Sequence, residues 1–106
     1  MFKTDYPVPY YAVIFTSLRT EGENGYGQMS EQMALLASQQ EGYLGFESAH
    51  DEQLGISISY WDSLEAIKKW KAHATHQLAQ QFGREKWYKS YQVRVVKVEK
   101  SYGFEL

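Results

Sequence analysis

The chain has 106 residues, the size of one domain, and its 11 Lys and Arg against 13 Asp and Glu give a net charge of −2. This charge disfavours nucleic acid as a partner, because duplex-binding domains usually carry a basic surface. The absence of cysteine excludes disulfides, thiolate metal sites and cysteine nucleophiles. No apolar run has the roughly 20 residues of a membrane span, and the start lacks a signal-peptide pattern. We therefore expect a cytoplasmic globular domain that does not bind a membrane.

The anomalous feature of the composition is its aromatic content, with nine Tyr, five Phe and three Trp. A domain of this size buries only about 60 to 70% of its unfolded surface, so its core cannot readily hide so many rings. Large exposed apolar surfaces usually mark interfaces or ligand cavities. The composition predicts an oligomer, a pocket, or both.

The N-terminal part is predicted to be an extended arm over residues 1–9, which contain both prolines, followed by a single domain over residues 10–106. Residues 10–19 are rich in aromatic and β-branched side chains, which is typical of a strand. Three glycines within residues 20–27 indicate a loop, and we expect this loop to lie at the mouth of a cavity.

A first helix is predicted over residues 28–40, where apolar side chains recur at helical spacing. Gly42 follows it as a normal stop signal. Residues 43–50 and 55–61 are predicted to form two further strands joined by a turn.

Residues 55–61 alternate with the period of a strand whose two faces meet different environments. One face carries Ile56, Ile58 and Tyr60, and the other carries Ser57, Ser59 and Trp61. Because helices demand an apolar face, we expect the first set to pack under the helices. The second set is then predicted to line one cavity per subunit.

The second helix is predicted to begin at a capping box, with Asp62 as the cap and Glu65 reaching back to it. An apolar stripe continues through this helix until Gly83 ends it. Residues 88–100 are predicted to form the last strand.

The element order β-α-β-β-α-β predicts the ferredoxin-like α+β fold, a four-stranded antiparallel sheet with two helices on one face. The first and last predicted strands are apolar on both faces, and such strands need cover on both sides. The chain has no further element to supply the second cover. We therefore predict a homodimer whose two sheets face each other across a shared barrel.

Three segments carry a resemblance to a known family. They are the strand-to-helix segment 59–67 (SYWDSLEAI), the helical segment Trp70-Lys71-Ala72-His73 with His76, and the strand 91–99 with the ending Tyr102-Gly103-Phe104. Over residues 10–104 the chain resembles the antibiotic biosynthesis monooxygenase family of small dimeric α+β barrel proteins. That family includes oxygenases, haem-degrading enzymes and proteins of no known activity, so the resemblance is specific for the fold and not for the chemistry.

The resemblance implies different chemistries at different positions. Members that oxygenate aromatic polyketides without a cofactor use an Asn and a Trp on the third strand; Trp61 matches the Trp, and Ser57 stands in place of the Asn. Haem-degrading members use a Trp on the second helix, matched by Trp70, and a His ten residues later, where this chain has Gln80. They also use an Asn on the first strand, which this chain lacks. The resemblance thus favours a cofactor-independent monooxygenase acting on a small aromatic or quinol-type molecule.

For that reaction we expect His73 and Trp61 to be the catalytic residues, with His73 as the base. The residues expected to bind substrate are Ser57, Ser59, Trp70 and Arg94, among which Ser57 and Arg94 would stabilise the substrate anion. No metal or other cofactor is expected.

Each of these residues also has a structural interpretation. Trp61 can be a core residue, and His73 and His76 can lie at the solvent edge, since two histidines at this spacing lack the further ligands of a metal site. Arg94 can form an internal pair with Glu47. The alternative function is a non-catalytic dimeric barrel that binds or senses a small hydrophobic molecule.

Both termini are too aromatic for solvated tails. Phe2, Tyr6 and Tyr10 lie in or beside the N-terminal arm, and Tyr102 and Phe104 lie at the other end. We expect at least one tail to pack on the body of the domain or to clasp a partner subunit.

Overall fold

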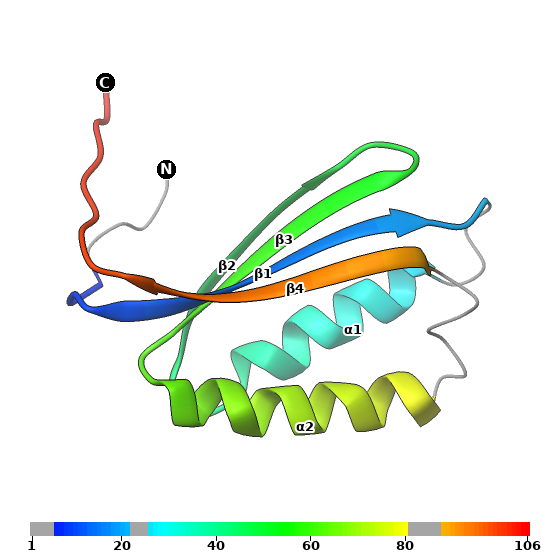
Figure 1. The fold of residues 1–106 in the computed structure, drawn as a ribbon, viewed down its shortest axis with the longest axis horizontal. Helices are drawn as coiled ribbons and strands as arrows, with labels where there is room; N and C mark the ends of the chain where they lie inside the picture. Colours follow the sequence, from blue (N-terminus) through cyan, green and yellow to red (C-terminus); the bar gives the residue numbers. More distant parts are fainter. Residues whose placement is uncertain (1–5, 22–25, 81–87) are drawn as a thin grey trace.

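The computed structural model describes residues 6–21, 26–80 and 88–106 and has the predicted order of elements (Figure 1). The elements are β1 (Tyr10–Arg19), α1 (Tyr26–Ser38), β2 (Tyr43–His50), β3 (Leu54–Trp61), α2 (Leu64–Gln80) and β4 (Tyr88–Val98). The strands form one antiparallel sheet in the order β2-β3-β1-β4. Both helices cover the same face of this sheet, as Figure 1 shows. The predicted ferredoxin-like α+β fold is confirmed; the predicted helix end at Gly83 lies outside the described residues.

The core lies between the helices and the sheet. Its buried members are Ala37 from α1, Trp61 from β3, and Ala66 and Ile67 from α2. Small side chains on both helices let the large indole of Trp61 approach them, and this indole is completely buried. The close approach of helices to sheet therefore depends on one large ring packed among small residues.

Helix α2 begins one residue later than predicted. The Ser63 side chain, not that of Asp62, accepts a hydrogen bond from the backbone N–H of Ala66, at 3.1 Å. Ser and Asp are both favoured N-cap residues, so the helix keeps a favourable cap although its start shifts by one residue.

Gly42 connects α1 to β2 in a conformation that favours glycine, with φ at +89°. A Cβ at this position would lie 2.5 Å from the Cβ of Ala66 and 2.6 Å from a carboxyl oxygen of Asp62. The backbone N–H of Asp62 also donates a 2.8 Å hydrogen bond to the Gly42 carbonyl. This glycine therefore ties the start of β2 to the start of α2.

The turn between β2 and β3 is organised by Asp51. Its carboxylate accepts hydrogen bonds from the backbone N–H groups of Gln53 and Leu54, at 2.8 and 2.7 Å. These two bonds lower the pKa of Asp51 below its usual value, because they stabilise the charged form.

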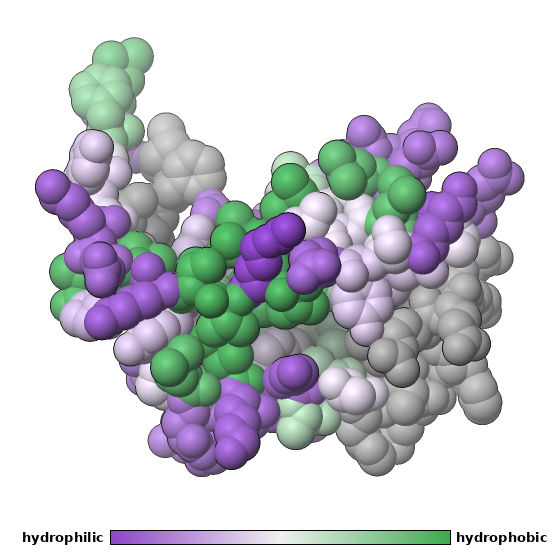
Figure 2. Space-filling model, in the orientation of Figure 1, coloured by the Kyte–Doolittle hydropathy of each residue, from purple (hydrophilic) through white to green (hydrophobic). Residues whose placement is uncertain are grey.

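The sheet face opposite the helices, which we call the open face, has no helix on it in the described part of the chain. It carries the even-numbered residues of β1, β3 and β4, and Ile56 and Val96 are exposed there by 43% and 37%. At the edge of the sheet, β4 also exposes Val93 and Val95 on the helix side. The predicted apolar character of both faces of this strand is confirmed. In Figure 2 hydrophobic side chains form a band across this part of the surface.

Tyr6 of the N-terminal arm and the C-terminal tail lie on the side of the open face (Figure 1). Tyr6 packs on the sheet, with its ring centroid 5.4 Å from that of Tyr10 and 6.0 Å from that of Tyr60. This confirms that the N-terminal arm contacts the body of the domain. The C-terminal tail, residues 99–106, instead stands away from the body, and Tyr102 and Phe104 are 87% and 84% exposed.

Within the described residues, neither helix combines the length and the apolar character needed to cross a membrane.

Candidate functional site

A cavity of about 170 Å³ lies between the sheet and the two helices. Apolar and aromatic side chains form most of its wall, which consists of Val13, Phe15, Ser30, Met33, Ala34, Ala37, Phe46, Ser57, Ser59, Trp70, Ala74 and Tyr88. An apolar cavity of about 150 Å³ can hold benzene. This cavity therefore has the volume for one aromatic ring, and we call it the ring cavity.

Strand pairing explains which residues reach the ring cavity. In the antiparallel register Phe15 of β1 lies opposite Ser57 of β3, and Val13 lies opposite Ser59. Side chains alternate between the two faces along each strand, so these four residues point toward the helices together. The cavity exists because positions 57 and 59 carry serine, and a larger core side chain at either position would fill the space.

The predicted facing of β3 is wrong. Trp61 packs beneath α2, and Tyr60 lies on the open face, where its hydroxyl donates a hydrogen bond to the Glu47 carboxylate. Ile56 and Ile58 share the open face with Tyr60. The serines thus line a cavity as predicted, but this cavity lies under the helices and not inside a barrel.

Trp61 reaches the ring cavity only through Ser59. Its indole N–H donates a 2.8 Å hydrogen bond to the Ser59 hydroxyl oxygen, and both side chains are buried. In this bond the Ser59 hydroxyl is the acceptor, so its own proton can be donated to a ligand. Trp61 is therefore placed to orient a hydroxyl group, while the wall of the cavity does not include its own ring.

Trp70 and His73 lie next to each other on α2. The Trp70 ring stacks on Trp61 with centroids 5.9 Å apart and forms part of the cavity wall. The ring centroid of His73 lies 6.0 Å from that of Trp70, and His73 is not among the wall residues. His73 Nε2 is buried and has no hydrogen-bond partner in the described part of the chain. The side chain of His76 lies outside the part that can be described.

Arg94 lies on the open face and does not meet the serines. In the sheet it is opposite Ile14, which is opposite Ile58, which is opposite Glu47, so three strand spacings separate the two charged residues. At about 4.8 Å per spacing this is roughly 14 Å. The expected internal Arg94–Glu47 pair is therefore wrong for a single chain, where Glu47 is bonded to Tyr60.

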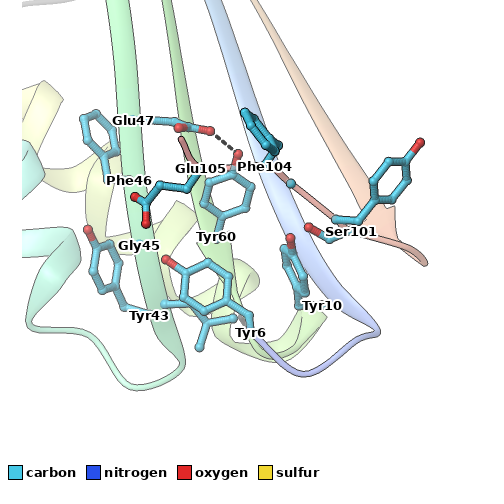
Figure 3. Close-up of a pocket in the computed structure, with 13 residues that line it drawn as sticks. Tyr6, Tyr10, Tyr43, Gly45, Phe46, Glu47, Tyr60, Ser101, Phe104 and Glu105 are labelled. Atoms are coloured by element: carbon cyan, nitrogen blue, oxygen red, sulfur yellow. Dashed lines mark hydrogen bonds between the residues drawn. The ribbon is translucent and has the colours of Figure 1, made fainter. Parts of the chain in front are cut away.

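A second, larger hollow lies on the open face between the sheet and the C-terminal tail (Figure 3). Its volume is about 970 Å³, and its sheet side is formed by residues including Tyr10, Tyr43, Glu47 and Tyr60. Burial, and next the hydrogen bond to Glu47, raise the pKa of Tyr60 well above its usual value, because both disfavour the phenolate. Burial alone raises the pKa of Tyr43. We call this space the tail hollow.

Several wall residues were not singled out from the sequence. Phe15 and Val13 alternate on β1, and Met33 and Ala37 are four residues apart on the apolar stripe of α1. These periodicities were visible, but they predict core positions and do not indicate which of them border an empty space. The Glu47–Tyr60 hydrogen bond could not be predicted from sequence spacing either, because it joins residues of two different strands.

The described residues contain no group of three or more His, Asp or Glu side chains placed to hold a metal ion. The loop predicted at the cavity mouth includes residues 22–25, which lie outside the described part of the chain.

One four-stranded antiparallel sheet with both helices on the same face defines the class of this protein as a ferredoxin-like α+β domain. Residues 9–81 match the model of the family described as antibiotic biosynthesis monooxygenase. The chain belongs to the antibiotic biosynthesis monooxygenase family.

Among known proteins, the chain is 49% identical over 104 residues to the uncharacterized protein YqjZ of Bacillus subtilis (strain 168), covering 97% of this chain and 90% of that protein. The structure resembles protein SO0527 from Shewanella oneidensis with a TM-score of 0.72 at 11% identity, covering 91% and 97% of the two chains. It also resembles SnoaB, a cofactor-independent oxygenase from Streptomyces nogalater, with a TM-score of 0.68 at 11% identity, covering 88% and 96%. At such low identity these two structures support the fold alone.

Proposed function

We propose that this protein is a cofactor-independent monooxygenase that acts on a small aromatic or quinol-type molecule held in the ring cavity. The observation that carries the proposal is the cavity itself, whose volume of about 170 Å³ suits one ring and whose wall combines apolar side chains with the hydroxyls of Ser57 and Ser59. Pockets for small molecules typically have this composition. Membership of the family described as antibiotic biosynthesis monooxygenase supports the same reaction class.

In the proposed reaction the substrate supplies all the electrons. Its deprotonated form reacts with O₂, one oxygen atom enters the product and the other leaves as water. The two serines would hold the substrate oxygen as its negative charge develops, with Ser59 oriented by Trp61. Trp70 would stack against the ring, and the apolar side chains of the wall would replace water on the sides of the substrate that they cover.

The proposed base is His73, which must reach the substrate past Trp70. Its buried Nε2, without a partner among the described residues, supports this role. Arg94 lies on the opposite face of the sheet, so the expected role of its side chain as a donor to the substrate anion is not part of this proposal.

One observation favours the second candidate function, a non-catalytic domain that binds a small hydrophobic molecule. Among the described residues, the cavity wall contains no carboxylate, imidazole, ammonium or guanidinium group. A binding pocket has no need of such a group, whereas proton abstraction does.

Oxygen uptake with a panel of hydroquinones and hydroxylated bicyclic aromatics separates the two functions. We expect uptake that falls when Ala74→Leu fills the cavity, and that is retained in Ala72→Leu, a matched change at an exposed position of the same helix. A compound that binds the wild-type protein without oxygen uptake, and that no longer binds the Ala74→Leu variant, would support the binding function instead. Equal behaviour of the two variants would exclude the ring cavity as the site.

We also propose that a second copy of the chain covers the open face and makes a homodimer. The exposed apolar side chains of β3 and β4 on that face support this, since contiguous exposed apolar surface is unusual on a monomer. Sedimentation equilibrium at micromolar concentration tests it, and a monomer under these conditions would contradict it.

A further inference from the structure

Phe46 of β2 belongs to the wall of the ring cavity and is nevertheless 42% exposed. Among the wall residues that the structure describes, one other, Ser30 of α1, is exposed, and the rest are buried or half-buried. Ser30 lies eight residues before the end of α1, about 12 Å along a helix, and Phe46 lies three residues after the start of β2, about 10 Å along a strand. Because α1 packs on β2 from their shared connection, the two exposed residues mark the edge where the cavity comes closest to solvent.

A register shift in β2 turns Phe46 toward the helices. Tyr43 pairs with Trp61, but Gly45 pairs with the residue just before Trp61, so Leu44 is one extra residue in β2. Residues three apart on a regular strand face opposite sides of the sheet, and an extra residue changes which way the following side chains point. Tyr43 and Phe46 therefore both face the helices. Tyr43 packs on Trp61 with ring centroids 5.6 Å apart, and Phe46 borders the ring cavity.

Phe46 also lies next to the polar part of the cavity. It is directly opposite Ser59 in the pairing of β2 with β3, and opposed side chains have Cβ atoms about 5 Å apart. A ligand oxygen bound to Ser59 therefore has the Phe46 ring beside it. Because β2 is an edge strand, no further strand of the described sheet covers the outer side of Phe46. On that side Phe46 borders the tail hollow (Figure 3), and it is the residue that the two described walls share.

Other large side chains of the cavity wall are held by aromatic neighbours. Phe15 packs against Tyr88 with ring centroids 5.4 Å apart, and Trp70 stacks on Trp61. No aromatic ring within the described ranges stacks on Phe46 in this way. Loss of the Phe46 ring would therefore enlarge the cavity toward solvent without disrupting an aromatic cluster.

The size of the cavity makes Phe46 decisive for the choice of ligand. The volume of about 170 Å³ is close to that of an apolar cavity that holds benzene, about 150 Å³, so a second fused ring does not fit. Replacing phenylalanine with alanine removes one whole aromatic ring. The space that this substitution opens is the space that a second fused ring needs.

We propose that Phe46 is the specificity-determining residue of the ring cavity and that it restricts the ligand to molecules with a single aromatic ring. A larger ring system would have to occupy the place of the Phe46 side chain and extend through the edge between α1 and β2. This inference rests on the proposed function, because it takes the ring cavity as the ligand site, and it adds the size class of the ligand.

Calorimetric titration of the full-length protein with phenol and with 1-naphthol tests the proposal, under nitrogen so that binding alone is measured. Phe46→Ala should lower the dissociation constant of 1-naphthol at least about tenfold, on the order of the effect of a hydrocarbon group that a pocket either accommodates or rejects. Phenol should bind this variant no more tightly than it binds the wild-type protein, because phenol gains no contact and loses the Phe46 ring.

Phe104→Ala is the matched control, because it removes the same ring from the tail hollow and leaves the ring-cavity wall unchanged. We expect it to leave both dissociation constants unchanged. An equal effect of Phe104→Ala and Phe46→Ala on 1-naphthol would overturn the role of Phe46. Equal affinity of the wild-type protein and Phe46→Ala for 1-naphthol would overturn it as well.

Failure of the proposed function gives a different result. Phenol that binds the wild-type protein and Ala74→Leu equally, or that does not bind the wild-type protein, overturns the ring cavity as the ligand site and the size limit with it. Phenol binding that is lost in Ala74→Leu, together with 1-naphthol binding that is insensitive to Phe46→Ala, overturns the size limit only.

A second substitution at the same position keeps the proposal testable if circular dichroism shows that Phe46→Ala does not fold. Phe46→Leu retains an apolar side chain on the strand and removes the aromatic ring. It should lower the dissociation constant of 1-naphthol in the same direction, by a smaller factor than Phe46→Ala. A folded Phe46→Leu protein that binds 1-naphthol no better than the wild-type protein would overturn the proposal.

Discussion

Replacing Trp61 with phenylalanine should destabilise the protein more than the same replacement at Trp70. The Trp61 indole is completely buried, and its N–H donates a 2.8 Å hydrogen bond to Ser59, which is itself buried. Loss of that bond leaves a buried hydroxyl without its donor and costs about 1 kcal/mol. Loss of part of the ring costs about another 1 kcal/mol through the space it leaves.

The sum, roughly 2 kcal/mol, is a large share of the 5 to 15 kcal/mol that stabilises a typical domain. For a domain of about 100 residues it corresponds to a fall in melting temperature of roughly 8 to 15 °C. Trp70 is half-buried, and the described part of the chain offers no acceptor for its N–H, so Trp70→Phe should cost only the ring contribution, about 1 kcal/mol.

Urea unfolding followed by circular dichroism at a fixed protein concentration measures both losses. A Trp61→Phe loss no greater than that of Trp70→Phe would contradict the role of the Ser59 bond. Repetition at a tenfold higher protein concentration provides a further check. If Trp61 lined an interface between subunits, the stability lost in Trp61→Phe would depend on the protein concentration. We expect the same loss of stability at both concentrations.

Three further predictions concern the conformation and titration of single residues. Gly42→Ala should destabilise the fold by about 1 to 3 kcal/mol in urea unfolding, because φ is +89° and the new Cβ would overlap Ala66; a loss below 0.5 kcal/mol, on the order of an ordinary surface change, would contradict this. The lowered pKa of Asp51 means that its contribution to stability is present above its usual pKa and is lost as pH falls through the folded value, so the stability gap between wild type and Asp51→Asn should narrow in acid; a gap that is constant from pH 6 to pH 2 would count against it. The raised pKa of Tyr60 means that the unfolded chain ionises first as pH rises above about 10, so stability should fall there, and less steeply in Tyr60→Phe; parallel alkaline profiles of the two proteins would refute the burial of this phenol.

The fold could be predicted from the sequence because each element has its own local signal. The strands are rich in β-branched and aromatic residues, and the bounds of β1 and β2 agree with the predicted ranges. A strand alternation identifies two faces, but it does not say which one the helices cover. Ile56 and Ile58 looked like the natural helix-facing set, yet the open face is apolar as well.

The candidate site was only partly predictable for the same reason. A buried indole N–H needs a hydrogen-bond acceptor, and Ser59 lies two residues before Trp61 on the same face of the strand. This spacing could have predicted the Trp61–Ser59 hydrogen bond. The cavity depends on the distance between layers, which arises from packing among residues far apart in the sequence. His73 beside Trp70 illustrates the difference: spacing on the helix placed the two together, but it could not show that Trp70 alone reaches the cavity.

Neighbouring residues of a strand point to opposite faces of the sheet, so the two faces of this protein can change in sequence independently. Along β3, Ser57 and Ser59 face the ring cavity, and Ile58 between them faces the opposite side. Positions 57 and 59 can therefore be varied to suit a new ligand while the even-numbered positions keep the other surface intact. A library restricted to positions 57 and 59 would explore ligand choice without redesigning the opposite face. A family built on this sheet can diversify what it binds while conserving how its open face is used.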